Sequence, residues 1–304
     1  MPISTINNAS FADTAVHGQR NLIINGGFQC WQRSTDNEST STSWGYRTVD
    51  RFKTNKGRYR KTSDTVDGRT VDVVQIDPSS GVYHGGRGMF TMLEDYNAYD
   101  KPTVLSVYIK ADAATTADIG QLYDYGGGST VQAGTTVNIT TSWQRFEVQY
   151  SAQTFTQAAG HYIINALVDG RTYYVAMAQL ETGTQATPFE HRSFGDELRR
   201  CQRYYQSIDT NGRTQTIGFG HRQTTNTVRF SIPTPVALRA DPSISISGTV
   251  SCQESDGSST ATTSISGLYN SNGYVVATGT ASGVVLGSIT MQGTSGTVQI
   301  DAEL

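Results

Sequence analysis

Short runs of alternating apolar and polar side chains recur along this chain, and they restrict its fold more than any other feature. In residues 103–110, Leu105, Val107 and Ile109 fall at every second position. This period places the three side chains on one face of a half-buried strand. Comparable runs, separated by turn-forming Gly, Asp or Asn, cover residues 21–28, 71–76, 137–139, 143–150, 162–167, 173–180, 227–232, 243–250, 284–291 and 297–300. Strands at such short intervals predict an all-β sandwich or jelly roll rather than alternating helices and strands.

Composition favours a folded protein with polar turns. Only 16% of the 304 residues are charged, whereas disordered chains usually carry many charges. The 16 Tyr, 10 Phe and 3 Trp need burial or a partner. The net charge is −3, and the small basic group Arg58, Arg60 and Lys61 is interpreted as a solvated strand face. We therefore expect no nucleic-acid partner.

The cysteines and the N-terminus bear on where the chain is made. Cys30, Cys201 and Cys252 are odd in number and far apart, which favours free thiols in a reducing cytoplasm. Residues 1–15 show no signal-peptide pattern. No apolar run reaches the ~18 residues that a membrane-spanning helix needs, so no membrane insertion is expected.

One segment breaks the β pattern. Ser193 precedes Asp196 by three residues, which is the spacing of a capping box, and Asp196 and Glu197 complement the dipole of a helix that starts there. Helical spacing over about three turns gives an apolar face that packs either inside its own domain or between subunits. The residues of this expected face, a candidate oligomer seam, are Leu198, Cys201, Tyr205 and Ile208.

Two parts of the sequence resemble jelly-roll modules of bacteriophage tail-fibre proteins, which are similar in layout to carbohydrate-binding modules. The first is residues 21–28 (NLIINGGF), followed by residues 31–33 (WQR) and 49–52 (VDRF). Residues 101–111 and 142–147 are similar to inner strands of the same module, and residues 179–205 are similar to its last strand and the following helix. The match covers roughly residues 21–205.

The resemblance implies a jelly-roll β-sandwich, a short connecting amphipathic helix and a smaller C-terminal β-sandwich. The expected divisions are an N-terminal arm at residues 1–20 that anchors the chain to the virion, the jelly roll at 21–191, the helix at 192–208 and a C-terminal β domain at 209–304. It further implies a virion protein that is commonly trimeric. Modules of this kind often hold a structural calcium, and Asn25 and Glu181 are the positions that can donate oxygens. No other cofactor is expected.

The sequence holds no motif for an enzyme. Nucleophile elbows, Walker loops, zinc-protease motifs and Cys-x-x-Cys are all absent, and residues 84–88 (HGGRG) are interpreted as a Gly-rich turn. Glycan cleavage needs two carboxylates about 5–10 Å apart. The acidic side chains that leave a polysaccharide depolymerase open as an alternative are Glu94, Asp95, Asp100 and Asp124.

Two predicted loops have the composition of a sugar-binding surface, because pyranose rings stack on aromatic side chains while carboxylates and amides bind hydroxyl groups. An interface with a neighbouring subunit is the alternative for the same aromatic residues. The candidate contact residues are Asp95, Tyr96, Tyr99, Asp100, Tyr123, Asp124 and Tyr125. Trp31, Trp44 and Trp143 are expected in the core.

The resulting hypothesis is a homotrimeric tail-fibre or receptor-binding protein, made in the host cytoplasm and located in the virion, that attaches to host surface glycan. The alternative is a decoration or assembly protein of the capsid, tail or baseplate, bound to other virion proteins through residues 1–20.

Overall fold

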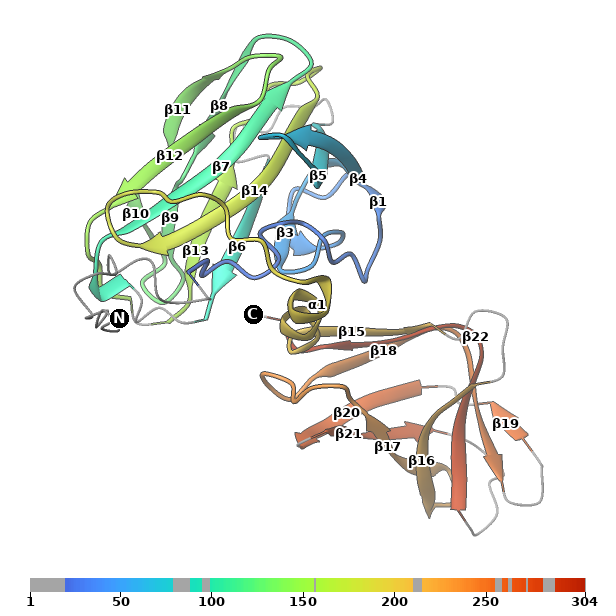
Figure 1. Ribbon diagram of the computed structural model, residues 1–304. Coiled ribbons are helices and arrows are strands. Elements are labelled where there is room, and N and C mark those ends of the chain that lie inside the picture. Colours follow the sequence, from blue (N-terminus) through green and yellow to red (C-terminus); the bar gives the residue numbers. More distant parts are fainter. Residues whose placement is uncertain are drawn as a thin grey trace, which may run out of the picture. The chain divides into compact units, whose positions relative to one another are not determined.

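The computed structural model describes residues 20–78, 88–94, 99–155, 157–209, 215–254, 259–261, 264–271, 273–280 and 288–303. Strands dominate these residues, and one short helix is present among them, so the predicted all-β fold class is confirmed (Figure 1). The chain forms two compact units, Met1–Ser193 and Phe194–Leu304. The predicted arm lies outside the described residues except for Arg20.

The first unit is a β-sandwich of two antiparallel sheets, here named sheet A and sheet B. Sheet A has the order β1 (Asp36–Ser39), β4 (Gly57–Val66), β5 (Arg69–Asp77), β14 (Tyr173–Thr182), β7 (Thr103–Ala111) and β12 (Gln144–Tyr150). Sheet B has the order β10 (Ser129–Gln132), β9 (Leu122–Asp124), β13 (Ala159–Ile164), β6 (Met89–Leu93), β3 (Phe52–Thr54) and β2 (Gly45–Tyr46). A separate pair joins β8 (Thr115–Ile119) to β11 (Thr135–Ile139).

The alternation read from the sequence decides which side chains lie between the sheets. Leu105, Val107 and Ile109 of β7 are buried in the core of the sandwich, as their spacing predicts. In sheet B, Met89 and Leu93 of β6 face the same core, while Phe90 between them lies on the other face. Each sheet therefore has an outer face that carries its own set of side chains.

Residues 21–28 do not form the predicted strand. They make a turn against an irregularity in β14, where the register with β7 shifts between Ala176 and Gln179 and Met177 has a φ of 50°. The Asn21 amide donates to the Ala178 carbonyl at 3.0 Å and accepts from the Leu180 N–H at 3.1 Å. The prediction failed because asparagine and glycine satisfy backbone groups that would otherwise pair in a sheet.

A glycine is required at one position of this turn. The Gly26 carbonyl accepts the Ala178 N–H at 2.9 Å, and a Cβ at Gly26 would overlap the Ala178 carbonyl oxygen. The two backbone segments are therefore closer to each other here than a side chain at Gly26 would allow. We name this contact of Asn21 and Gly26 with Ala178 and Leu180 the β14 clasp.

The second unit begins with helix α1 (Phe194–Gln202), directly after Ser193, with Asp196 and Glu197 in its first turn. Its sheet has the order β19 (Ser259–Ala261), β18 (Ser243–Glu254), β22 (Ser288–Asp301), β16 (Gln215–Thr224), β17 (Thr227–Pro233), β21 (Tyr274–Thr280) and β20 (Ser264–Ser271), and β15 (Tyr205–Asp209) also pairs with β22. A Cβ at Gly267 of β20 would overlap the carbonyl oxygen of Pro242, just before β18. The sheet is thus strongly curled (Figure 1).

The predicted helix at residues 192–208 is too long. Tyr204 donates its N–H to the Cys201 carbonyl at 2.9 Å in a turn, and Tyr205 then pairs with Asp301 in the sheet. Strand pairing replaces the helix because it satisfies the backbone while burying the Tyr205 side chain. The expected four-residue face therefore does not exist, since Tyr205 and Ile208 lie in β15 and Ile208 packs on the core of its own unit.

A buried polar pair lies within the core of the first unit. Tyr99 and His161 are both fully buried, and the Tyr99 hydroxyl is hydrogen-bonded to Nε2 of His161. The His161 ring also contacts the edge of Tyr150. Burial lowers the pKa of His161 from 6.5 to about 3, so this imidazole is neutral in the folded protein at neutral pH.

Asn21→Ala tests the β14 clasp. We expect it to lower the free energy of unfolding of the first unit by about 2–4 kcal/mol, because buried groups left without partners cost about 1–3 kcal/mol each. Urea unfolding followed by tryptophan fluorescence measures this unit, since Trp31, Trp44 and Trp143 all lie in it. Asn138→Ala on exposed strand β11 is the control and should stay within about 0.5 kcal/mol of wild type. Equal effects of the two substitutions would contradict the clasp.

His161 makes the stability of the first unit depend on pH. Between pH 6.5 and 3 the unfolded chain binds a proton at this side chain that the folded chain does not, so the free energy of unfolding falls as the pH falls. The expected loss is about 2 kcal/mol between pH 7.5 and 5, from ~1.4 kcal/mol per unit of pKa shift. Unfolding curves of His161→Gln over this range should show a smaller loss, and an unchanged one would refute the assignment to His161.

Candidate functional site

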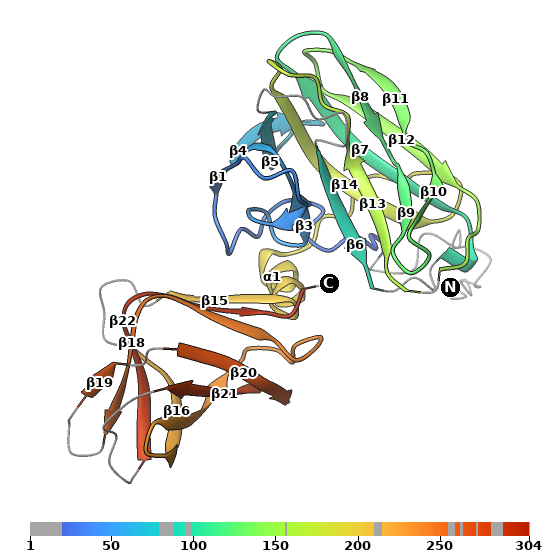
Figure 2. The same cartoon turned by 180° about the vertical axis from the view of Figure 1, so that it is seen from behind.

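The outer face of sheet B carries a row of large side chains aligned across four strands. Tyr46 of β2 pairs with Lys53 of β3, Lys53 pairs with Phe90 of β6, and Phe90 pairs with Tyr162 of β13. In the cartoon seen from behind, β6, β13, β9 and β10 run side by side (Figure 2). Because alternate residues share a face, the sheet itself brings these side chains together.

Three further aromatic residues complete this surface. The Trp44 ring meets Phe90 and Tyr162 edge to face, with centroids 4.8 and 5.5 Å apart. The Tyr125 ring stacks on Phe90 at 6.0 Å and meets Tyr123 at 5.0 Å. Phe90 is fully buried beneath these half-buried neighbours. We name the whole set the aromatic surface; its members are Trp44, Tyr46, Lys53, Phe90, Tyr123, Tyr125 and Tyr162.

Gly160 makes room for one of these rings. It lies in β13, paired with Tyr123 of β9, and a Cβ built on it would come within 2.6 Å of the Tyr125 ring. A larger residue would force Tyr125 away from the sheet. The absence of a side chain is thus what allows Tyr125 to lie flat over Phe90.

Cations lie over the rings of the aromatic surface. The Lys53 ammonium is 5.1 Å from the Tyr46 ring centroid and 5.7 Å from those of Phe90 and Tyr125. The Arg33 guanidinium lies 5.4 Å from the centroid of the same Tyr46 ring. Such contacts favour a charged group over the aromatic face. Lys53 therefore stays at the surface as a hydrogen-bond donor beside the rings.

Two phenol groups of the surface, those of Tyr125 and Tyr162, are neutral at physiological pH. Burial, followed by the influence of neighbouring tyrosines, raises the pKa of Tyr125 well above its ordinary value, and burial also raises the pKa of Tyr162. The two hydroxyls are hydrogen-bonded to each other. Neutral hydroxyls can both donate and accept, which suits polyhydroxylated ligands.

The structure places the predicted contact residues in different environments. Tyr123 and Tyr125 lie on the aromatic surface, and Asp124 between them accepts the Gly126 N–H at 2.9 Å in the β9–β10 turn. Asp95 and Tyr96 lie outside the described residues. Asp100 is exposed. Tyr99 is not a surface residue as predicted, because its ring packs in the core against Phe155 and His161.

The prediction that all three tryptophans lie in the core is wrong for Trp44, which lies on the outer face of sheet B. Trp31 is partly buried against the core of the sandwich, and Trp143 is partly buried against a smaller hydrophobic cluster on the outer face of sheet A. Trp143 donates to Asp64 at 3.2 Å, and Lys110 lies over its ring at 5.1 Å while also binding Asp64. The two sheets therefore each carry one half-buried tryptophan on their outer faces.

The sequence interpretation missed Trp44, Tyr46, Lys53, Phe90 and Tyr162. A signal was present in β13, where His161 and Ile163 face the core and Tyr162 between them therefore faces outward. Trp44 and Tyr46 gave no such signal, because β2 is only two residues long. Strand order alone decided that these segments, distant in sequence, meet on one face.

Asn25 and Glu181 do not fit the calcium ion that the resemblance implies. The Asn25 amide donates to the carbonyls of Cys30 and Asp50 and accepts the Cys30 N–H, at 2.9 to 3.0 Å. The Glu181 carboxylate accepts the N–H and hydroxyl of Thr187. Hydrogen bonds within the protein thus already use these oxygens.

Among the described residues no group of three or more His, Cys, Asp or Glu side chains is arranged to hold a metal ion. No helix in the described part of the chain has the length and apolar character needed to cross a membrane.

Solved structures of carbohydrate-binding modules are among those similar to this chain. A family 30 carbohydrate-binding module is 13% identical over 52% of this chain and 88% of its own, with a TM-score of 0.32. A CBM22-1 xylan-binding domain from Paenibacillus barcinonensis Xyn10C is 16% identical over 52% of this chain and 96% of its own, with a TM-score of 0.34.

A phage protein is similar to the same extent. The enzymatically active domain of tailspike protein 4 from bacteriophage CBA120 is 14% identical over 55% of this chain and 22% of its own, with a TM-score of 0.36. No protein-family model matches the chain, and no curated protein matches it in sequence. Identity and TM-score are low throughout, so none of these proteins supplies a function to this chain.

Gly160→Val tests how the aromatic surface is built. The added side chain should displace Tyr125 and lower the free energy of unfolding by about 1–3 kcal/mol, the usual cost of overpacking. In a Tyr125→Ala background the same substitution should cost much less, because the ring it would strike is gone. Urea unfolding of the four proteins gives the coupling between the two sites, and a coupling near zero would show that Gly160 serves another purpose.

Proposed function

We propose that this chain is a non-catalytic glycan-binding protein of a bacteriophage particle, a tail fibre or receptor-binding protein, and that its aromatic surface holds host surface glycan. The observation that carries the proposal is the cross-strand alignment of Tyr46, Lys53, Phe90 and Tyr162 with Trp44 and Tyr125 around them. The partly exposed rings of Trp44, Tyr46, Tyr125 and Tyr162 can meet the C–H faces of sugar rings, while the buried Phe90 ring supports them from below. The hydroxyls of Tyr123, Tyr125 and Tyr162 and the Lys53 ammonium lie beside them for sugar hydroxyls.

The neighbouring rings suit an extended chain of sugars better than a single one. Adjacent strands are about 4.8 Å apart, so a row across four strands is roughly 14 Å long. That length exceeds a single pyranose ring. An oligosaccharide lying across β2, β3, β6 and β13 would contact several rings at once, and its affinity would grow with the number of sugar units that they contact.

The virion role rests on the resemblance of residues 21–28 and 179–205 to phage structural proteins. Attachment of residues 1–20 to other virion proteins and a homotrimeric state are parts of the same proposal. Leu198 remains a candidate seam residue, since it is only partly buried on α1, whereas Cys201 is buried. Labelling this protein on the particle and imaging it tests the virion location directly.

Trp44→Ala tests glycan binding against a matched control. Removing the Trp44 ring takes one face from the aromatic surface, so affinity for host surface oligosaccharide should fall about tenfold or more, equal to about 1.4 kcal/mol. Trp143→Ala removes a similarly half-buried tryptophan from the outer face of sheet A and should leave affinity within about twofold of wild type. Calorimetry on both variants measures this, with tryptophan fluorescence confirming that each is folded.

A folded wild-type protein that binds no host glycan would refute the glycan-binding half of the proposal. Equal losses in the two tryptophan variants would refute the assignment to the aromatic surface. Release of reducing ends from host polysaccharide on incubation would instead support the depolymerase alternative. Loss of incorporation into particles after deletion of residues 2–20, without glycan binding, would favour a decoration or assembly protein.

A further inference from the structure

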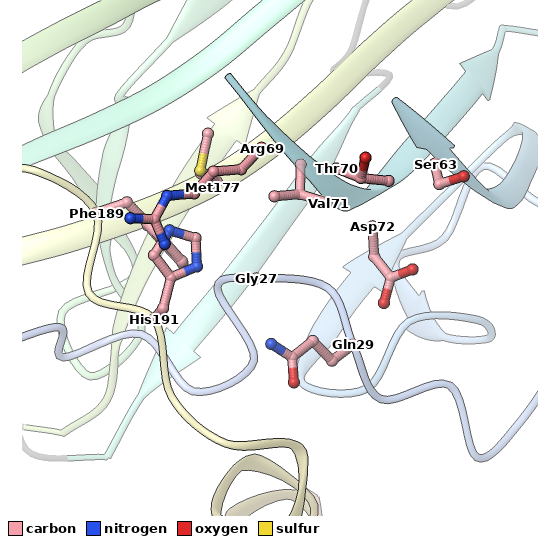
Figure 3. Close-up of a pocket in the computed structure, with 10 residues that line it drawn as sticks. All are labelled: Gly27, Gln29, Ser63, Arg69, Thr70, Val71, Asp72, Met177, Phe189 and His191. Atoms are coloured by element: carbon pink, nitrogen blue, oxygen red, sulfur yellow. The ribbon is translucent and has the colours of Figure 1, made fainter. Parts of the chain in front are cut away.

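A pocket of about 580 Å³ lies in the first unit, away from the aromatic surface (Figure 3). It is bounded by the end of the β4–β5 hairpin, by the turn that contains Gly27 and Gln29, and by Phe189 and His191 after β14. None of its lining residues belongs to the aromatic surface. Its volume is within the range of ligand-binding sites in proteins.

One end of the pocket combines aromatic and cationic groups. The Phe189 and His191 rings meet edge to face with centroids 5.0 Å apart, and Phe189 packs against Met177 of the β14 irregularity. Figure 3 shows Arg69 extending toward this group. The Arg69 guanidinium makes no hydrogen bond or ion pair with any described residue, although its charge acts on His191.

The other end of the pocket is polar. Asp72, Gln29 and Ser63 lie together there, away from the aromatic end (Figure 3). The Asp72 carboxylate is 3.1 Å from the Lys61 ammonium, which also donates to the Gln29 carbonyl at 3.1 Å. The charge of Asp72 is therefore balanced within the protein. The uncompensated charge of the pocket is the positive charge of Arg69.

His191 does not add to this positive charge at neutral pH. Burial, and secondly the charge of Arg69, lower the pKa of His191 below its ordinary value. The neutral ring forms an apolar edge beside Phe189 and can exchange hydrogen bonds. Arg69 thus supplies the net positive charge of a pocket whose other side chains are aromatic, apolar, neutral or balanced by a neighbour.

We propose that this pocket binds an acidic sugar, that is, a uronic-acid residue of a polysaccharide. Arg69 would hold the carboxylate through its paired N–H groups, as guanidinium groups commonly do. The C–H face of the pyranose would lie on Phe189 and Met177, and its hydroxyls would reach Asp72, Gln29 and Ser63. A neutral sugar would leave Arg69 unused and bind more weakly.

The pocket shares no lining residue with the aromatic surface, so the two binding proposals can be tested separately. Trigalacturonate and its neutral methyl ester differ in charge and little in shape, and calorimetry with both measures the contribution of charge. Wild type should bind the acid at least about tenfold more tightly than the ester, equal to about 1.4 kcal/mol. Arg69→Gln should remove this preference. Arg171→Gln, an exposed arginine outside the pocket, is the charge-matched control and should retain it.

Trp44→Ala separates this site from the proposed glycan surface. It should leave the binding of trigalacturonate unchanged, because Trp44 does not line the pocket. Loss of acid binding in Trp44→Ala with full binding in Arg69→Gln would place the acid on the aromatic surface and overturn the pocket. Equal losses of the preference for the acid in Arg69→Gln and Arg171→Gln would show that it comes from the net charge of the protein and would overturn the pocket. A wild-type protein with no preference for the acid would also overturn the proposal.

Discussion

The β14 clasp is the contact on which the rest of the first unit depends. Asn21 binds the backbone of Ala178 and Leu180, which lie near the end of the first unit and more than 150 residues away in sequence. The Glu190 carboxylate extends this contact, accepting the Asn21 N–H at 2.8 Å and pairing with Arg192 at 3.0 Å. Buried groups of this kind are costly when they lose a partner, so both ends of the unit must be in place together.

The clasp also gives a physical reason for the two stretches that resemble phage modules. The Gln179 side-chain amide donates to the Glu181 carboxylate at 2.7 Å, and its Oε1 accepts the Glu190 N–H at 2.7 Å. Asn21, Gln179 and Glu190 of these two stretches thus make hydrogen bonds that hold the ends of the sandwich together. Their role is structural, whereas Gly27, Phe189 and His191 of the same stretches line the pocket.

Two outer regions of the same sandwich remain for ligands, and they differ in character. The aromatic surface is broad and rich in neutral hydroxyls, which suits stacking of an extended glycan. The pocket beside β5 is partly open to solvent and carries the unpaired charge of Arg69, which suits one acidic sugar residue. The outer face of sheet A around Trp143 is different again, because Lys110 and Asp64 satisfy each other there.

The sequence by itself determined the all-β class, the positions of several long strands such as β7, β12 and β14, and the start of α1, since alternation and capping are local signals. It did not determine that residues 21–28 form a turn or that α1 ends at Gln202, because there long-range backbone pairing with β14 and β22 overrides local preference. For the site it found Tyr123 and Tyr125 but placed Tyr99 wrongly. Burial of Tyr99 and the meeting of Trp44, Phe90 and Tyr162 are set by strand order and register, which only the tertiary structure decides.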